Sequence, residues 1–305
     1  MITRFAPSPT GPLHLGHAYS ALLAYDMTMA EGGKFLLRIE DIDQSRCRPK
    51  WEAQIYDDLR WLGIRWDAEP LRQSDRMPVY QTALDDLWRR GLIYPCTCTR
   101  RDIELALSAP QEGVERTCGP DGPVYPGTCA KSLWFERTFP EAYPRPADLT
   151  QRLEMSLAVA YAGFEHRIER AGGGWSSFLS FKETGSGPGH HTGLIKFTPD
   201  QIITDFGDIV LARKDIGTSY HLSVVLDDAA QNITHVVRGE DLFDATRIHV
   251  ILQHLLGLPT PTYHHHRLVR DATGKRLAKR DDARAISLFR AEGATPDDIR
   301  RMVGL

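Results

Sequence analysis

Two histidines three residues apart, His14 and His17, lie near the N-terminus, after a short run at residues 2–5. The run has the length of a β-strand, residues 6–12 form a turn rich in proline, serine and glycine, and a helix is expected to follow. Free N–H groups at the start of such a helix favour an anion, and Gly16 lets a nucleotide approach the backbone closely. Both histidines can therefore face the same phosphates, although His-x-x-His alone also fits an ordinary capped helix.

A second group of charges lies far along the chain, at residues 274–280, where Lys275, Arg276, Lys279 and Arg280 follow closely on one another. Four cations in so short a segment repel one another unless an anion binds among them. A nucleotide triphosphate would supply that anion, since lysine and arginine neutralise the charge that builds on a leaving pyrophosphate. An ordinary solvated basic loop is the better explanation when the segment is taken alone.

The segments that must position these residues have the sequence pattern of alternating strands and helices. An apolar stripe from Leu15 predicts a helix that stops at Gly32 and Gly33, and residues 34–39 have the pattern of a buried parallel strand. Further helices are expected from Pro49, from Pro78 to Gly91, at residues 220–227, 245–256 and 283–305, with strands at residues 209–212 and 233–237. This alternation predicts an α/β fold with a doubly wound parallel sheet.

The middle of the chain, from Cys96 to about Gly193, departs from this pattern because it is rich in proline, glycine and cysteine. We interpret it as a subdomain inserted into the main sheet. The expected division is a first half of the nucleotide-binding domain at residues 1–92, the inserted subdomain at 93–200, the second half at 201–262, and the basic loop with short C-terminal helices at 263–305.

Composition narrows the class of protein. A chain of 305 residues that is 42% hydrophobic and 25% charged can bury one large core or two joined ones. Its formal net charge of -3 means that any RNA contact would use local basic patches. We see neither a signal peptide nor an uncharged apolar stretch long enough to span a bilayer. Five cysteines, an odd number, suit reduced thiols or a metal better than disulfides, so we expect a cytoplasmic protein.

Considered together, the histidine segment and the basic segment resemble the paired signatures of class I aminoacyl-tRNA synthetases. The motif His14-Leu15-Gly16-His17 is similar to the HIGH signature and Arg276-Leu277-Ala278-Lys279-Arg280 to the KMSKS signature, in the same order and separation. Residues 4–8, 38–43 and 238–242 add a more specific resemblance to glutamyl-tRNA synthetases. The resemblance implies the Rossmann-type catalytic domain of that class.

The same resemblance implies that glutamate binds between these motifs. Arginine forks suit its two carboxylates, Glu40 can bind its ammonium group, and Tyr220 offers a hydroxyl. The implied glutamate-binding residues are Arg4, Phe5, Ala6, Pro7, Ser8, Glu40, Tyr220 and Arg238. For Arg38, Asp41 and Asp43, which neighbour Glu40 in the sequence, we expect structural ion pairs instead.

The implied reaction is attack of the glutamate α-carboxylate on the α-phosphorus of ATP, with pyrophosphate leaving and Mg²⁺ accompanying the nucleotide. Positioning and charge neutralisation do most of such catalysis, so no protein nucleophile is required. The implied catalytic residues are His14, His17 and Lys279, and the implied ATP-binding residues are His14, Gly16, His17, Arg276 and Lys279. The basic motif departs from the family at Arg276, which replaces a lysine, and at Ala278 and Arg280, which replace serines. These substitutions concern the dynamics of the basic loop and the rate of the reaction, and not the class of reaction.

Cysteines gather in the first part of the insertion. A structural zinc takes four ligands in a tetrahedron, and chemistry alone offers Cys96, Cys98, Cys118 and Cys129. Glutamyl-synthetase-like proteins that carry Cys-x-Cys followed by Tyr-x-x-x-Cys are similar to this chain, which implies the set Cys96, Cys98, Tyr125 and Cys129, with Cys118 as the rival fourth ligand. Free thiols are the alternative, because Cys-x-Cys is a loose pattern. The adjacent histidines at residues 264–266 alternate faces on a strand, so they cannot all bind one ion.

Only about 25 residues follow Arg280, far fewer than an independent anticodon-binding domain needs. This short ending, with Tyr125 in the cysteine cluster, resembles the family of glutamyl-queuosine tRNA(Asp) synthetases. The resemblance implies that L-glutamate is activated with ATP without tRNA and is then esterified to queuosine at the wobble position, so that the site meets the tRNA(Asp) anticodon loop. Two alternatives stay open: a truncated glutamyl-tRNA synthetase that charges a tRNA 3′ end, and an inactive module that binds RNA. We expect no membrane partner and a monomer.

Overall fold

The computed structural model describes residues 1–108, 118–132, 143–163, 166–169, 175–270 and 284–305. The basic segment with Arg276 and Lys279 therefore lies outside the described residues. Among the helices within the described ranges, none combines the length and the apolar character that crossing a bilayer requires.

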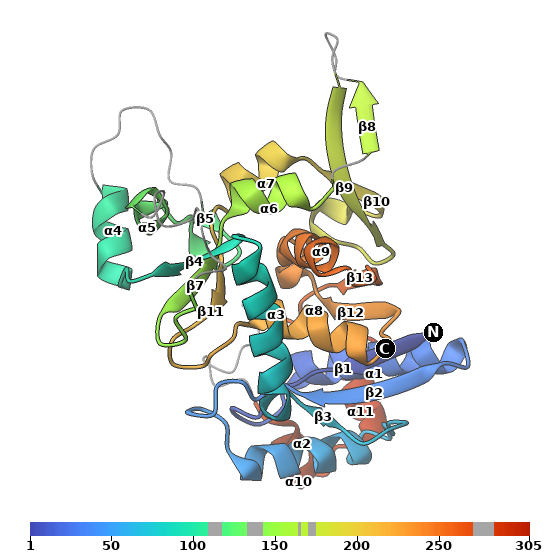
Figure 1. Ribbon diagram of the computed structural model, residues 1–305. Coiled ribbons are helices and arrows are strands. Elements are labelled where there is room, and N and C mark those ends of the chain that lie inside the picture. The colour runs from blue at the N-terminus through green and yellow to red at the C-terminus, as the bar shows by residue number, and fades with distance from the viewer. Residues whose placement is uncertain (109–117, 133–142, 164–165, 170–174, 271–283) are drawn as a thin grey trace.

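Parallel strand pairs form the centre of the molecule. These strands are β1 (Ile2–Phe5), β2 (Lys34–Ile39), β3 (Leu71–Arg72), β12 (His235–Gly239) and β13 (Thr262–His266). β1 pairs with β2 and β2 with β3, while β12 pairs with β13. The two groups join where the N–H of Thr234 donates to the carbonyl oxygen of Ile2 at 3.0 Å. Because this bond links the starts of β1 and β12, strands from distant parts of the chain lie side by side and run the same way (Figure 1).

Side chains that alternate along these strands enter two hydrophobic cores, one on each face. On β2, Phe35 and Leu37 join one core and Leu36 contacts the other. The first core is covered by α1 (Leu15–Ala30) and α2 (Pro49–Trp61), and the second by α3 (Met77–Arg89), α8 (Tyr220–Ala230) and α9 (Ala245–Leu256). Helices on both faces of parallel strands agree with the doubly wound α/β arrangement predicted from the sequence.

The segment between α3 and α8 adds mainly antiparallel strands. These are β4 (Ile93–Cys96), β7 (Thr150–Leu153) and β11 (Val210–Ala212) in one sheet, the hairpin β5 (Cys118–Gly119) and β6 (Gly122–Pro123), and β8 (His166–Glu169), β9 (Trp175–Glu183) and β10 (Gly193–Phe197). β9 also pairs in parallel with β13 and so widens the central sheet. The short helices of this segment are α4 (Arg100–Ser108), α5 (Thr128–Ser132), α6 (Met155–Tyr161) and α7 (Pro199–Asp205).

One hydrophobic core extends from this segment into the rest of the fold. The hydrophobic core beneath α8 and α9 also contains Leu92, Phe181, Phe197 and Leu211. Those residues come from both sides of positions 92 and 200, where the sequence suggested domain limits. The inserted segment therefore shares its core with the rest of the fold, and the limits themselves stay a prediction.

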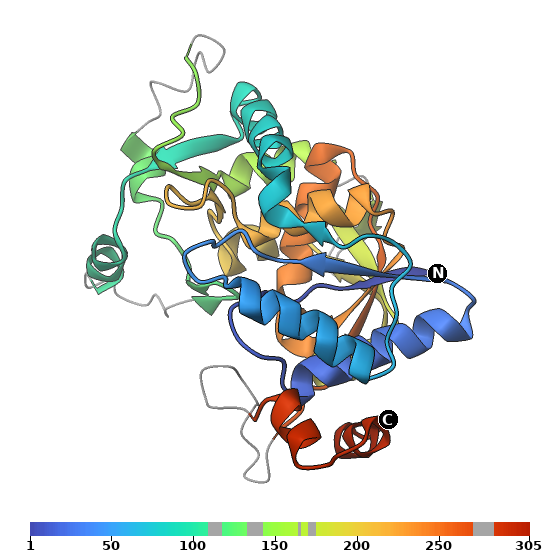
Figure 2. The ribbon, with the colours of Figure 1, turned by 90° about the horizontal axis from the view of Figure 1, so that it is seen from below.

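Two short helices, α10 (Ile286–Ala291) and α11 (Pro296–Val303), end the described chain and lie next to α1 (Figure 2). Ile286 and Ile299 are fully buried in the core that α1 shares. Arg300 of α11 donates to both carboxylate oxygens of Asp26 on α1, at 2.6 and 2.9 Å. The helical ending that the sequence predicts is thus confirmed, and it closes one face of the sheet.

Asp58 of α2 makes the stability of this fold depend on pH, because its side chain is only 1% exposed. Burial, with Asp57 beside it, raises the pKa of Asp58 to about 6. A folded-state pKa above the unfolded value means that the free energy of unfolding falls as pH rises from about 4 to about 6 and stays lower above that. We expect Asp58→Asn to raise the free energy of unfolding by about 1 kcal/mol at pH 8, and by much less at pH 4, in urea titrations.

The matched control is Asp57→Asn, since the Asp57 side chain is 66% exposed and pairs with Arg290 on the surface. Its effect should stay within about 0.5 kcal/mol at both pH values. An equal gain from both substitutions would assign the effect to net charge and not to the buried carboxylate.

Candidate functional site

A cavity of about 490 Å³ opens where β1, β2 and β12 end. Nine residues predicted from the sequence line it: Arg4, Phe5, Ala6, His14, Gly16, His17, Glu40, Tyr220 and Arg238. Pro7 and Ser8 do not, although the carbonyl oxygen of Pro7 accepts the Glu40 N–H at 3.0 Å. Ligands of α/β sheets bind outside the carboxyl ends of the strands, which is where this cavity lies.

The start of α1 forms one wall of this cavity. Nδ1 of His14 accepts the Gly16 N–H at 3.1 Å, and Nδ1 of His17 accepts the His14 N–H at 3.2 Å. The two rings lie 3.8 Å apart, and a Cβ on residue 16 would sit 3.0 Å from Cε1 of His14, so this packing suits glycine. The sequence left a helix cap and a ligand site as alternatives for these histidines. The structure shows that the same side chains cap the helix and line the cavity.

The described residues on either side of the basic segment lie beside this wall. Val269, which comes before the segment, lines the cavity. Ala285, which comes after it, forms a β-bridge with His14, and the Ile286 N–H donates to the carbonyl oxygen of Leu13 at 2.8 Å. The chain therefore leaves and re-enters the described fold close to the start of α1.

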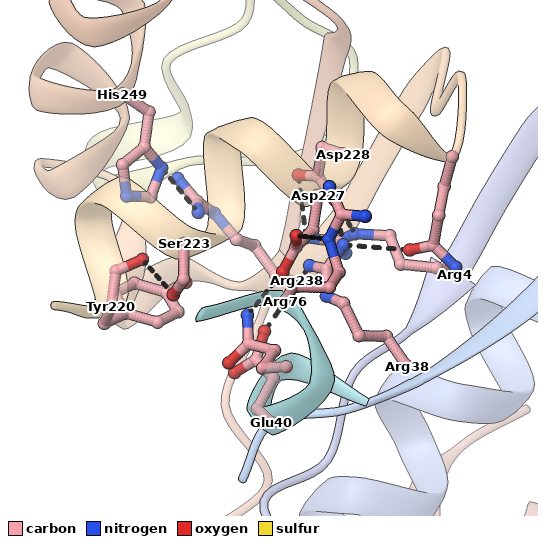
Figure 3. Close-up of polar contacts among 12 residues, drawn as sticks. Arg4, Arg38, Glu40, Arg76, Tyr220, Ser223, Asp227, Asp228, Arg238 and His249 are labelled. Carbon is pink, nitrogen blue, oxygen red and sulfur yellow. Dashed lines mark hydrogen bonds and ion pairs between the residues drawn. The ribbon is translucent and has the colours of Figure 1, made fainter. Parts of the chain in front are cut away.

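Asp228 of α8 gathers two arginines at the back of the cavity (Figure 3). Nε of Arg4 donates to Asp228 at 2.8 Å and Arg38 at 2.7 Å, and Arg38 also lies 3.4 Å from Glu40. Although burial opposes it, the charges of Arg4 and Arg38 lower the pKa of Asp228. The structural ion pair expected for Arg38 is confirmed. One side of the Arg4 guanidinium is already occupied, because its NH2 also lies 3.4 Å from Asp228.

Asp41 and Asp43 contact serine donors in this structure. Asp41 accepts bonds from the N–H and the hydroxyl of Ser74, at 2.8 and 2.7 Å. Asp43 accepts the hydroxyl of Ser45 at 2.5 Å. Both carboxylates therefore accept hydrogen bonds from nearby serine donors, a contact that stabilises turns.

Glu40 and Tyr220 both line the cavity. Burial raises the pKa of Glu40 while Arg38 and Arg4 oppose the rise, so a cation bound beside this carboxylate would favour its charged form. Burial also raises the pKa of Tyr220, which keeps its hydroxyl protonated and able to donate. The pair offers an acceptor for an ammonium group and a donor for an oxygen.

Arg238 is a buried cation that forms no ion pair with any carboxylate of the described residues. Its Nε donates to His265 at 3.1 Å, NH1 to Nδ1 of His249 at 3.1 Å, and NH2 to the Leu242 carbonyl and the Thr246 hydroxyl at 3.1 and 2.6 Å. These bonds use four of the five N–H donors of a guanidinium. A buried positive charge without a counter-ion is costly, so the site favours an anionic ligand next to Arg238.

Sequence reasoning missed the histidines that surround this arginine. His249 and His265 contact Arg238 directly, and Nε2 of His266 lies 2.8 Å from the hydroxyl of Ser20 at the cavity wall. His265 and His266 end a parallel strand, and that position could have identified them as site residues. His249 lies on the buried face of α9 together with the polar residues Thr246 and Gln253, and a buried imidazole needs polar partners.

A second cluster lies in the inserted segment. The sulfur atoms of Cys96, Cys98 and Cys129 all lie within 4.8 Å of one another. The Tyr125 hydroxyl is 3.5 Å from Cys96 and 3.3 Å from Cys98, whereas Cys118 is exposed and is not a member of this cluster. A tetrahedral zinc with Zn–S bonds of about 2.3 Å holds its sulfurs roughly 3.8 Å apart. The spacing of this donor set therefore fits such an ion.

Electrostatics favour a thiolate at Cys129, whereas burial raises the pKa of the Cys98 thiol to about 11. Burial opposes ionisation of Cys129, but hydrogen bonds from Tyr125, the Thr97 backbone and Cys98 lower the pKa of its thiol to about 6. Arg152 adds a buried cation: its Nε donates to Cys96 at 3.3 Å, and its guanidinium lies 3.8 Å from the centre of the Tyr125 ring. Positive charge at this place offsets the negative charge of metal-binding thiolates.

Known proteins share both the sequence and the fold. The family model for the catalytic domain of class I (E and Q) tRNA synthetases matches residues 1–117 and 190–305. A glutamyl-Q tRNA(Asp) synthetase from Rhodobacter capsulatus is 59% identical over the full length of both chains. One from Rhodopirellula baltica is 37% identical and covers 98% of this chain and 83% of its own.

Among solved structures, a crystal structure of a glutamate tRNA ligase from Elizabethkingia meningosepticum, in complex with its amino acid, aligns with a TM-score of 0.69 and 25% identity. The alignment covers all of this chain and 60% of that longer protein. The match of the family model and the full-length identity agree with the cavity geometry. The chain belongs to the glutamyl-Q tRNA(Asp) synthetase family, within the class I (E and Q) synthetases.

Proposed function

We propose that this protein activates L-glutamate with ATP to glutamyl-adenylate without tRNA, and transfers the glutamate to the queuosine base at the wobble position of tRNA(Asp). The observation that carries the proposal is the cavity in which His14 and His17 at a helix start meet Glu40, Tyr220 and Arg238. One part of this cavity suits phosphates, and other parts suit an ammonium group and a carboxylate. We place the reaction in the cytoplasm and assign it to a monomer.

The cavity orients glutamate by its charges. The buried guanidinium of Arg238 attracts a carboxylate, Glu40 accepts bonds from the ammonium group, and Tyr220 donates to an oxygen. An α-carboxylate oxygen then attacks the α-phosphorus of ATP in line, the bond to the bridging oxygen breaks, and pyrophosphate leaves. His14, Gly16 and His17 would face the phosphates, and Mg²⁺ bound with ATP supplies further positive charge.

Transfer to RNA is the second step. A hydroxyl of queuosine attacks the acyl carbon of glutamyl-adenylate, an ester forms, and AMP leaves with the electron pair of the broken bond. The anticodon loop must therefore reach the mouth of the cavity. Since the net charge is only -3, local cationic side chains and not the overall charge would hold the RNA.

Glutamate-driven exchange of labelled pyrophosphate into ATP, measured without tRNA, tests the first step. Labelled glutamate is then offered to tRNA(Asp) with and without queuosine, and we expect label only on the modified RNA. Exchange that requires tRNA, with label at the 3′ end, would indicate a truncated glutamyl-tRNA synthetase. Absence of exchange under all these conditions would indicate an inactive module that binds RNA.

A structural zinc would be held by Cys96, Cys98, Cys129 and the phenolate of Tyr125. Such an ion would stabilise the folded state, because it would link the end of β4 to the start of α5. Arg152 would lie beside two of the four ligands and balance their charge. Tyr125 is favoured over Cys118 because its hydroxyl already lies within 3.5 Å of two of the cysteine sulfurs.

We expect protein purified without chelator to contain one zinc per chain, and removal of the metal to lower the thermal unfolding midpoint. Tyr125→Phe should lose most of the zinc, because the donor atom disappears while the ring stays. Cys118→Ser should keep a full equivalent and serves as the matched control. Elemental analysis measures both, and a wild-type protein without zinc would contradict the proposed site.

A further inference from the structure

Arg238 is held by a chain of polar side chains that reaches the protein surface. On one side, NH1 lies 3.1 Å from Nδ1 of His249, whose Nε2 lies 3.1 Å from Nδ1 of His221. Nε2 of His221 in turn lies 3.0 and 3.2 Å from the carboxylate oxygens of Asp121. Arg238, His249 and His221 are each at most 6% exposed, whereas the Asp121 side chain is 60% exposed. Figure 3 shows the first of these contacts, between the guanidinium and His249.

The hydrogen bonds along this chain can be donated in one direction only, from Arg238 towards Asp121. A guanidinium only donates, so Nδ1 of His249 must accept and its proton must reside on Nε2. That N–H points at Nδ1 of His221, which must also accept, so the proton of His221 resides on Nε2 and points at Asp121. Burial and the adjacent Arg238 lower the pKa of His249 far below its ordinary value, which keeps this imidazole neutral. Each hydrogen bond therefore fixes the tautomer that the next one requires.

A second arm holds the other side of the guanidinium. Nε of Arg238 donates to Nε2 of His265 at 3.1 Å, and Nδ1 of His265 donates to Glu183 at 2.5 Å. Glu183 is 1% exposed and also accepts the His265 N–H at 2.9 Å. This arm belongs to the central sheet, since Glu183 ends β9 and His265 lies on β13. The arm through His249 is different, because it leaves the sheet and ends on the hairpin of β5 and β6.

We propose that His249 and His221, anchored by Asp121, are positioning residues that hold the Arg238 guanidinium in the orientation that glutamate requires. Neither residue lines the cavity itself: their hydrogen bonds lead to Arg238, and both rings also lie 5.6 Å from the ring of Tyr220. They contribute no atom to the reaction. The proposal rests on the proposed function, in which Arg238 binds a substrate carboxylate. It also makes the β5–β6 hairpin of the inserted segment a support of the amino-acid site, which the order of residues along the chain does not suggest.

Paired substitutions of His249 separate positioning from general stability. The amide oxygen of His249→Asn takes the place of Nδ1 and keeps the acceptor for Arg238, whereas His249→Gln places its amide near Nε2 and loses that acceptor. We expect His249→Gln to raise the KM for glutamate in pyrophosphate exchange roughly 10-fold to 100-fold, with kcat and the KM for ATP within about 3-fold of wild type. His249→Asn should restore most of the loss, and Asp121→Asn should raise the KM roughly 3-fold to 10-fold.

Matched controls are His254→Leu, an exposed histidine on the same helix, and Asp244→Asn, an aspartate with a 61% exposed side chain. Both should leave the KM for glutamate unchanged. In an Arg238→Lys background, which removes the NH1 donor, His249→Gln should add no further rise, because the residue acts through that donor. An additive rise, or equal losses for His249→Asn and His249→Gln, would overturn the proposal. If the wild-type protein catalyses exchange and every variant has the same KM values as the wild type, only the positioning role is refuted. If the wild-type protein neither catalyses exchange nor binds glutamate in calorimetry, the proposed function is refuted as well.

Discussion

Arg238→Ala should raise the KM for glutamate by roughly 100-fold to 1,000-fold in pyrophosphate exchange, because a carboxylate would enter a buried site that has lost its cation. Arg238 is 6% exposed and has no counter-ion among the described carboxylates, so we expect the substrate to supply the negative charge that the site lacks. The KM for ATP should change by less than about 3-fold, since we propose that Arg238 binds the amino acid and that the helix start binds the phosphates.

Arg213→Ala is the matched control, because Arg213 is exposed and its guanidinium forms an ion pair with Asp215 near β11. It should leave both KM values unchanged. Thermal unfolding of each variant separates loss of binding from loss of structure. A glutamate KM in a folded Arg238→Ala protein that equals the wild-type value would remove Arg238 from the binding site.

Lys279→Ala should lower the kcat of exchange by roughly 100-fold to 1,000-fold with little change in the unfolding midpoint. The expectation rests on the resemblance of residues 276–280 to a phosphate-contacting signature, in which Lys279 is the retained lysine. The structure adds that Val269 and Ala285, on either side of the basic segment, lie at the cavity and against His14. A cation in this segment would neutralise charge that builds on pyrophosphate as it leaves.

Single-turnover formation of glutamyl-adenylate, followed at saturating ATP and glutamate, measures this effect directly. Lys214→Ala, an exposed lysine between β11 and α8, is the matched control and should keep the wild-type rate. If Lys279→Ala forms the adenylate as fast as wild type, the basic segment has no part in the chemical step. If only the KM for ATP rises, the lysine binds the nucleotide in the ground state without assisting departure of pyrophosphate.

Local patterns along the chain were sufficient to predict the strands and helices that carry the site. The strand at residues 34–39 and the helix at residues 245–256 agree with β2 and α9 as the structure has them, because their apolar periodicity is local and strong. The motif around His14 and His17 was found in the same way. Its spacing requires only that a helix start after β1, which neighbouring residues decide.

The arrangement around Arg238 could not be found by such patterns. His221, His249 and His265 lie on three different elements, and only the tertiary fold brings them to one guanidinium. The sequence suggested that Arg4 and Arg238 offer forks for substrate carboxylates. In the structure Arg238 is buried and most of its N–H donors bond to neighbouring acceptors. Asp228 accepts hydrogen bonds from one side of the Arg4 guanidinium.

The chemistry was identified from the resemblance of two distant motifs, taken together, to the paired signatures of class I synthetases, since neither motif alone excluded an ordinary explanation. The tertiary structure decided which donors face the cavity, which carboxylates pair with arginines, and which fourth donor lies beside the three clustered cysteines. Those outcomes depend on contacts between residues more than 20 positions apart, such as Cys98 with Tyr125 and Arg4 with Asp228. The free energy of such contacts depends on burial and on partners, and neither property can be read from neighbouring letters of a sequence.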